Sequence, residues 1–305
     1  MKLLSILGPT GIGKSALAIQ LAKELDSEII SCDSMLVYRG MDIGTAKPSL
    51  QNQKEVTHHL IDILDFKEPY NVSLYVKNAK ACLDKIQNKG KIPILCGGTG
   101  LYAQAFIEGY QFYPRDELIA KKINRIYESG GCQYLINELQ QVDPTMASKV
   151  QNNPHRLMRT VEIFWLTGKV PQFVQSYQTA SDVECVQCVL IPCPDLLRKR
   201  IERRTSKMLS NGWLEETEKL ISQGFLDSPT ASKALGYRLI SSYLKGHISS
   251  KSELHERIVR GTCQYAKRQR TWFRNRHQSA KFVELNKEWN TQELVDRVLP
   301  LFMDG

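Results

Sequence analysis

Short apolar runs alternate with amphipathic segments over the first hundred residues of this chain. The apolar runs are typical of buried β-strands and fall at residues 3–7, 28–32, 59–64 and 92–96. A helix is predicted after the first run, from Ser15. The helix before the last run has an apolar face made of Val72, Val76, Ala79, Leu83 and Ile86 and ends at Gly90. This alternation predicts an α/β fold with a parallel sheet.

The pattern changes in the second third of the chain, where the strand-like runs disappear. Amphipathic segments follow, and the last of them begins at Asn153 as N-cap with Pro154 in the first helical position. The apolar run 188–191 then predicts a strand that returns the chain to the sheet, and the remainder is predicted to be helical. We therefore expect a helical insertion, residues 113–178, between two parts of one core, residues 1–112 and 179–305.

A glycine-rich segment joins the first predicted strand to its helix. The sequence GPTGIGKS at residues 8–15 fits the pattern G-x-x-x-x-G-K-[ST] in its proper strand-to-helix context. In such a loop, backbone N–H groups point into one concavity and the helix N-terminus adds partial positive charge. Lys14 would neutralise phosphate oxygens, and the Ser15 hydroxyl can ligate Mg²⁺. The residues predicted to bind a diphosphate are Gly8, Pro9, Thr10, Gly11, Ile12, Gly13, Lys14 and Ser15.

The position of the nearest carboxylate narrows the chemistry. Most P-loop enzymes that hydrolyse nucleotides hold Mg²⁺ with an acidic residue at the end of a second strand. Strand 92–96 instead runs into Gly97-Gly98-Thr99-Gly100, whereas a carboxylate, Asp33, follows strand 28–32. Active sites of parallel sheets gather at the carboxyl ends of strands, so Asp33 is a candidate catalytic residue, with a turn-forming Asp as the alternative. Routine ATPase or helicase work is disfavoured.

Composition adds a local excess of positive charge. The 305 residues are 42% hydrophobic and 24% charged, as in a globular protein of about two domains. Of the net charge of +9, residues 251–281 carry +7, because nine Lys and Arg stand there against two acids. This basic helix would have an apolar side made of Leu254, Ile258, Thr262, Tyr265 and Trp272. Its other side suits an RNA phosphate backbone, and a solvated helix face is the alternative.

The chain is expected to act in the cytoplasm. Gly8 and Pro9 interrupt the N-terminal apolar stretch before a signal-peptide core could form. No apolar run reaches the length of about 18 residues that a membrane span needs. The eight cysteines lie in apolar segments, as reduced core thiols do, and a metal site at Cys185, Cys188 and Cys193 is the less favoured reading.

Seven motifs in order along the chain resemble the tRNA dimethylallyltransferases, also called tRNA isopentenyltransferases. They are GPTGIGKS at 8–15, SCDSMLVYRGMDIGTAKP at 31–48, HHLIDI at 58–63, GGTGLY at 97–102, NPHRLMRTVEI at 153–163, ALGYR at 234–238 and QYAKRQRTWFR at 264–274. The resemblance implies a P-loop NTPase-like parallel sheet flanked by helices, with an all-helical insertion domain that binds the tRNA anticodon stem-loop. It also implies transfer of a dimethylallyl group from dimethylallyl diphosphate to N6 of the adenosine immediately 3′ of the anticodon, position 37, in tRNAs reading codons that begin with U. The family uses Mg²⁺ and no ATP.

The resemblance also assigns roles to residues. Asp33 resembles the general base that takes the N6 proton, and Lys14 and Arg204 resemble groups that hold the diphosphate. An adenine amine is a very weak acid, so Asp33 would act as the nitrogen becomes acidic during attack. The positions that resemble tRNA contacts are Asp33, Ser34, Met35, Leu36, Thr99, Lys121, His155, Arg156, Leu157, Met158, Arg159, Lys233, Ala234, Leu235, Gly236, Tyr237, Arg238, Lys267, Arg268, Arg270 and Arg274.

Two positions depart from the family pattern. Leu36 stands where the family usually has Gln, and Cys263 stands where it commonly has Arg, which affects tRNA affinity and selectivity more than the chemistry. The chain lacks the zinc-finger extension of eukaryotic relatives, so a bacterial-type, monomeric enzyme is expected. The alternatives are a P-loop kinase acting on a small molecule or nucleoside, a prenyltransferase acting on free AMP, and a non-catalytic RNA-binding protein.

Overall fold

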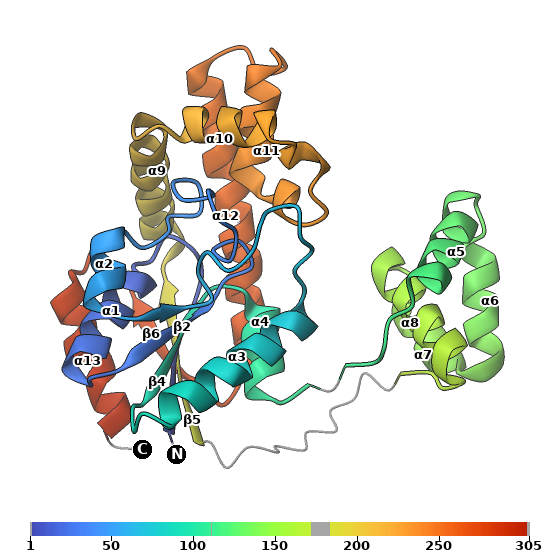
Figure 1. The fold of residues 1–305 in the computed structure, drawn as a ribbon, viewed down its shortest axis with the longest axis horizontal. Coiled ribbons are helices and arrows are strands. Elements are labelled where there is room, and N and C mark those ends of the chain that lie inside the picture. Colours follow the sequence, from blue (N-terminus) through green and yellow to red (C-terminus); the bar gives the residue numbers. More distant parts are fainter. Residues whose placement is uncertain (1, 111, 172–183, 304–305) are drawn as a thin grey trace. The chain divides into compact units, whose positions relative to one another are not determined.

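The computed structural model describes residues 2–110, 112–171 and 184–303. The chain folds into two compact units (Figure 1). The core unit comprises Met1–Gly109 and Thr179–Gly305, and the helical unit comprises Tyr110–Gln178.

Within the described residues, the core unit is built on a six-stranded sheet with the order β3-β2-β4-β1-β5-β6. All of its strand pairs are parallel, which confirms the predicted α/β fold with a parallel sheet. The strands are β1 (Lys2–Leu7), β2 (Glu28–Cys32), β3 (His58–His59), β4 (Pro93–Gly97), β5 (Glu184–Pro192) and β6 (Lys281–Leu285). The register sets Gly97 of β4 level with Leu7 of β1 and with Cys32 of β2. The loops that follow these three strands therefore leave from one edge of the sheet.

Helices cover both faces of the sheet because its strands are apolar on both sides. Leu3 and Leu7 pack in one cluster with Tyr75, while Leu4 and Leu17 pack in another on the opposite face. α1 and α13 lie side by side over the second cluster (Figure 1). The helices of the core unit are α1 (Lys14–Glu24), α2 (Leu50–Glu55), α3 (Val72–Gln87), α4 (Gly100–Ile107), α9 (Pro194–Ser210), α10 (Trp213–Ser222), α11 (Leu235–Leu244), α12 (Lys251–Arg276) and α13 (Thr291–Met303), with short 3₁₀ turns at Phe225–Asp227 and Ala231–Lys233.

The helical unit has four described helices and a small apolar core of its own. They are α5 (Glu117–Glu128), α6 (Cys132–Val142), α7 (Pro144–Val150) and α8 (Pro154–Thr167). The side chains of Asp116, Asp143 and Asn153 cap the N-termini of α5, α7 and α8 by accepting backbone N–H bonds. Buried residues from all four helices, among them Ile123 and Leu157, form the core.

Three elements differ from the sequence-based expectation. The strand predicted at 59–64 is only His58–His59, because Leu60 and Asp62 adopt left-handed conformations with φ of 62° and 56°. The C-terminal part is not wholly helical, since β6 adds a strand at the sheet edge. The basic helix ends at Arg276, before that strand.

The buried side of α12 also differs from the predicted one. Leu254 and Ile258 are buried as expected, but Tyr265 is 39% exposed and Trp272 is half-buried. The buried positions further along the helix are Ala266, Gln269 and Phe273. The apolar pattern alone misplaced the side because it counted aromatic residues as core and a buried glutamine as polar surface.

Helices α10 and α11 anchor the long connection that follows β2. The Glu216 carboxylate accepts backbone N–H bonds from Asp42 (3.0 Å), Ile43 (2.7 Å) and Gly44 (3.1 Å). It also accepts a bond from the Tyr237 hydroxyl at 2.6 Å. The Trp213 indole packs directly on the backbone of Gly44 and Gly236, where a Cβ atom would overlap the ring. The connection that carries Asp33 is therefore fixed from its far end.

Replacing Gly236 with alanine tests this packing. We expect Gly236→Ala to lower the free energy of unfolding by about 1–3 kcal/mol, because the new methyl group overlaps the Trp213 ring. Urea unfolding measures the change. Adding Trp213→Leu should restore part of the loss by making room, and Ser242→Ala on the same helix serves as control. An unfolding midpoint equal to that of the wild type would contradict the packing.

Candidate active site and RNA-binding surface

Three loops meet at the carboxyl edge of the sheet. The glycine-rich loop follows β1, Asp33 follows β2, and the Gly98–Gly100 turn follows β4. The turn is tied to the second loop, since Thr99 N–H donates to the Cys32 carbonyl (3.2 Å) and the Thr99 hydroxyl accepts from Ser34 N–H (3.2 Å). The adjacency of β1, β4 and β2 thus places the predicted phosphate loop beside the predicted base.

The glycine-rich loop presents an uncapped helix N-terminus. Gly13 adopts a left-handed conformation with φ 93° as the N-cap of α1, and α1 has neither a side-chain cap nor an acidic residue in its first turn. Gly8 passes so close to β5 that a Cβ atom would lie 2.6 Å from the Leu190 carbonyl oxygen. The free N–H groups and the helix dipole suit an anion, and binding of a diphosphate here stays a prediction.

Lys14 lies in a poorly solvated position inside this loop. Its ammonium donates to the Pro9 carbonyl at 2.7 Å. Burial, with a smaller contribution from the neighbouring Arg204 charge, lowers the pKa of Lys14 to about 8, and Asp33 opposes the shift. The lysine therefore lies close enough to both groups to feel their charges, and its proton is held weakly until an anion arrives.

Helix α9 brings two arginines to the loop, one turn apart. The Arg204 guanidinium donates from Nη1 to the Thr10 hydroxyl at 3.2 Å. Burial lowers the pKa of Arg204, and the charge of Asp33 raises it. Arg200 donates from Nε to the Gly11 carbonyl (3.2 Å) and lies 4.5 Å from the centroid of the Trp289 ring. Sequence reasoning missed Arg200, although its spacing of four from Arg204 puts both on one helix face.

Asp33 both forms a turn and faces the site. Its Oδ1 accepts backbone N–H bonds from Met35 (2.8 Å) and Leu36 (3.4 Å). Within the described part of the chain, no hydrogen bond to Oδ2 is found. Asp33, Ser34, Met35 and Leu36 are all half-buried. One carboxylate oxygen is thus held by the loop, and the other is left for a ligand.

Helix α12 forms a wall of the same site. Partial burial of Tyr265, together with the nearby charge of Asp33, raises its pKa to about 12. Gln269 bonds to both the glycine-rich loop and the Gly98 carbonyl, and a Cβ atom at Gly100 would overlap the Trp272 ring. Sequence reasoning missed Gln269, and the one signal for it was an uncharged residue inside the run KRQR.

The opposite side of α12 carries the basic residues. Lys267, Arg268 and Arg274 are exposed and Arg270 is half-buried. Arg274 pairs with Glu284 at 3.3 Å, and the Arg268 guanidinium lies 5.8 Å from the Tyr265 ring centroid. This side of the helix presents a row of cations to solvent, next to the wall of the candidate site.

The predicted contacts at 233–238 divide into exposed and buried residues. Lys233, Leu235 and Arg238 are exposed, and Ala234 is half-buried. Gly236 and Tyr237 are buried and hold the connection after β2 through Trp213 and Glu216. Burial raises the pKa of the Tyr237 hydroxyl strongly. In this structure the two buried residues stabilise the connection that carries Asp33, and they do not face solvent.

The helical unit carries the remaining predicted contacts. Lys121, His155 and Arg156 are exposed, Met158 is half-buried, and Leu157 is a buried core residue. Arg159 donates from Nη2 to the carbonyls of Tyr113 (2.9 Å) and Pro114 (3.0 Å) and pairs with Glu162 (2.8 Å). Arg159 thus ties the entry segment of the unit to α8.

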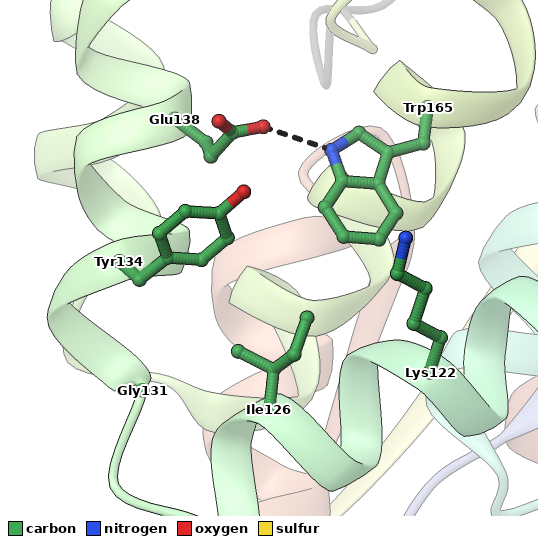
Figure 2. A pocket seen from close by; sticks show the side chains of 6 residues that line it. All are labelled: Lys122, Ile126, Gly131, Tyr134, Glu138 and Trp165. Atoms are coloured by element: carbon green, nitrogen blue, oxygen red, sulfur yellow. Dashed lines mark hydrogen bonds between the residues drawn. The ribbon is translucent and has the colours of Figure 1, made fainter.

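The helical unit also contains a surface cavity of about 700 Å³ (Figure 2). The Trp165 indole N–H donates to Glu138 at 3.1 Å, and the Lys122 ammonium lies 5.1 Å from the Trp165 ring centroid. Figure 2 shows Tyr134 across the cavity from this ring. None of the residues predicted to bind RNA lines the cavity; its lining residues are Lys122, Ile126, Gly131, Tyr134, Glu138 and Trp165.

The oxygen groups at the phosphate loop fit a hydrated magnesium ion. The Ser15 residue is exposed in the first turn of α1. Among the residues described, no group of three or more His, Cys, Asp or Glu could hold a metal ion. Mg²⁺ bound to a diphosphate usually keeps several waters and takes one or two protein ligands. A single hydroxyl at the loop is therefore sufficient protein ligation for such an ion.

No helix in the described ranges is long and apolar enough to cross a membrane.

Comparison with known proteins gives consistent matches. The model of IPP transferases matches residues 36–276, and the model of isopentenyl transferases matches residues 1–66. The tRNA dimethylallyltransferase of Syntrophomonas wolfei subsp. wolfei is 38% identical over an alignment of 307 residues that covers 100% of this chain and 98% of that protein. The tRNA dimethylallyltransferase of Carboxydothermus hydrogenoformans is 38% identical over 303 residues, covering 98% and 96% of the two chains.

Solved structures agree with these matches. The tRNA isopentenylpyrophosphate transferase of Bacillus halodurans superposes with a TM-score of 0.72 at 34% identity, covering 99% of this chain and 97% of that one. A eukaryotic dimethylallyltransferase acting on tRNA superposes with a TM-score of 0.84 at 26% identity, covering 99% of this chain and 80% of that one.

The weakly held proton of Lys14 should make anion binding depend on pH. A saturated alkyl diphosphate, whose own ionisation is complete above neutral pH, should bind progressively more weakly above pH 8, by up to about tenfold per pH unit. The charged lysine is lost there unless the anion restores it, so binding should take up a proton. Calorimetry in buffers of different ionisation enthalpy measures both effects. Lys14→Met should bind weakly at every pH, and a flat wild-type profile would contradict this account.

Proposed function

The chain belongs to the IPP transferase family, and we propose from this premise that it prenylates tRNA. It transfers the dimethylallyl group of dimethylallyl diphosphate to N6 of the adenosine immediately 3′ of the anticodon, position 37, in tRNAs that read codons beginning with U. The observation that carries this proposal is the meeting of an anion site, Asp33 and α12 at one edge of the sheet. The site thus offers places for a diphosphate, a proton and an RNA backbone side by side.

The phosphate loop serves the leaving group. Negative charge gathers on the diphosphate as its bond to the allylic carbon breaks, so preorganised positive groups stabilise the transition state more than the ground state. Lys14, the N–H groups at the start of α1, and Arg204 provide these groups. The Ser15 hydroxyl would hold Mg²⁺ at this loop, and the ion would supply further positive charge when bound.

Asp33 serves the nucleophile. The bonds from Met35 and Leu36 to Oδ1 fix the carboxylate, so Oδ2 accepts the N6 proton as the nitrogen attacks. The adenosine must leave the base stack to reach this carboxylate, which is easiest in a single-stranded loop. Leu36, adjacent to the reacting base, offers it an apolar contact where the family pattern has an amide.

Surface cations hold the RNA, and all of them are exposed except the half-buried Arg270. Lys267, Arg268, Arg270 and Arg274 on α12 contact the phosphate backbone, and so do Arg238 and Lys233. Lys121, His155 and Arg156 of the helical unit grip the anticodon stem-loop. The buried residues Leu157, Gly236 and Tyr237 act through the folds that they stabilise. The enzyme works as a monomer in the cytoplasm, where its tRNA substrate is found.

The first test is turnover itself. We expect the protein to form N6-(dimethylallyl)adenosine without any added nucleotide when it is incubated with Mg²⁺, dimethylallyl diphosphate and one unmodified tRNA. The tRNA is one that reads codons beginning with U. Mass spectrometry of the digested tRNA measures the product. AMP replaces tRNA in a parallel reaction, and product there alone would favour an adenylate prenyltransferase. Consumption of ATP with no prenylated RNA would favour a kinase instead.

Removing the proposed base should separate chemistry from binding. Asp33→Asn keeps an oxygen that accepts the Met35 and Leu36 bonds, so the loop should persist while kcat falls by about 10²- to 10⁴-fold. Affinity for tRNA, measured by fluorescence anisotropy, should stay within about threefold of wild type. Asp84→Asn on α3 is the matched control and should leave kcat unchanged. A kcat for Asp33→Asn close to that of wild type would rule out the base.

Reversing one charge on α12 should affect RNA alone. Arg268→Glu should weaken tRNA binding and reduce the slope of its salt dependence by about one, since a phosphate contact is lost. Binding of the alkyl diphosphate should be unchanged. Lys80→Glu on α3 makes the same change in net charge at a site away from α12. If that control weakened tRNA binding equally, the effect would come from net charge and not from this surface.

A further inference from the structure

Gln269 is a buried amide in the middle of the basic helix α12. Only 7% of the residue is exposed. Its Oε1 accepts the backbone N–H of Thr10 at 2.9 Å, and its Nε2 donates to the Gly98 carbonyl at 2.7 Å. Since one partner can only donate and the other can only accept, the orientation of the amide is fixed. A single side chain thus joins the loop after β1 to the turn after β4.

The packing between α12 and the turn after β4 is tight, and a side chain at Gly98 would displace the Gln269 amide. A Cβ atom at Gly98 would lie 2.6 Å from Nε2 of Gln269. Two residues on, the Trp272 ring packs against Gly100 in the same way. The glycines after β4 therefore let α12 approach the strand ends closely enough for the amide to reach both loops.

Each loop that Gln269 holds leads directly to a group of the proposed reaction. Gln269 binds the N–H of Thr10, and the hydroxyl of Thr10 accepts a hydrogen bond from the Arg204 guanidinium at 3.2 Å. Gly98 precedes Thr99, whose hydroxyl accepts the N–H of Ser34, the residue after Asp33. One path ends at the diphosphate and the other at the base. The amide spans the two ends of the group transfer.

Building on the proposed function, we propose that Gln269 is a positioning residue that sets the spacing between the diphosphate site and Asp33. It holds Thr10, and through it Arg204, at a fixed distance from the turn that carries Thr99. The same helix presents Arg268 to the RNA. A single rigid element therefore positions the RNA relative to both the diphosphate site and Asp33. The side chain touches neither substrate, and its effect is on geometry.

Gln269→Met tests the proposal, because methionine has similar length and volume and offers no amide. It leaves the Thr10 N–H and the Gly98 carbonyl without their partner, and misplaced reacting groups lose rate steeply. We expect kcat to fall by about 10- to 100-fold. Alkyl diphosphate binding should weaken by up to about tenfold, and the KM and Kd for tRNA should stay within about threefold. Gln264→Met, at an exposed position of the same helix, is the matched control and should change none of these values.

Gln269→Glu gives a second readout that a purely structural role would not move. The carboxylate keeps the acceptor for Thr10 but loses the donor to Gly98, and protonation restores that donor. The activity of this variant relative to wild type should therefore rise as the pH falls toward the carboxyl pKa. Near-wild-type kcat and diphosphate affinity in a folded Gln269→Met protein would overturn the proposal. So would an equal loss of kcat, tRNA binding and diphosphate binding that matched a loss of folded protein.

The two proposals fail in different ways. If the wild-type protein does not prenylate tRNA, the proposed function fails. Diphosphate binding to the wild-type and Gln269→Met proteins still tests the spacing of the loops in that case. If the wild type is active and Gln269→Met matches it, only the inference about Gln269 fails.

Discussion

The parallel register of three strands is the constraint on which the site depends. Leu7, Cys32 and Gly97 lie level with one another at the ends of β1, β2 and β4. The loops that follow these strands therefore lie next to each other at one edge of the sheet. The helices over both faces keep these strands buried, and α12 closes the edge from outside the sheet. Phosphate loop, carboxylate and basic helix come from distant parts of the sequence, and one sheet edge unites them.

Placing cations together without an anion has an electrostatic consequence. Burial lowers the pKa of both Lys14 and Arg204, and the charge of Arg204 adds to the lowering at Lys14. Carbonyl groups of the loop accept hydrogen bonds from the cations Lys14, at Pro9, and Arg200, at Gly11. In the connection after β2, the backbone N–H groups of residues 42–44 likewise have an internal acceptor, the Glu216 carboxylate. At the glycine-rich loop, Lys14 has a neutral carbonyl partner and, within the described residues, no salt bridge to a carboxylate, so the proposed anion would be its charged partner.

Local patterns made much of this structure predictable. The sheet strands other than β3 and β6, the phosphate loop, and the capped start of α8 at Asn153 each depend on a few neighbouring residues. The rest depends on contacts across long stretches of sequence. The residues around position 269 do not predict that its amide bonds to the backbone of residue 10. Those around position 216 do not predict the bonds of its carboxylate to the backbone at 42–44. The roles of individual residues at the site stay predictions, carried by family resemblance and geometry.

The order of strands along the chain also governs how the molecule is made. β1 lies inside the sheet between β4 and β5, but β5 follows β4 only after the whole helical unit. Synthesis at about 5–20 residues per second leaves β1 with one unpaired edge for roughly 5–20 s while that unit emerges and folds on local contacts. An apolar strand edge left open invites pairing with other chains. The helical insertion therefore carries a cost during synthesis, because it prolongs the period in which the chain can aggregate or bind chaperones.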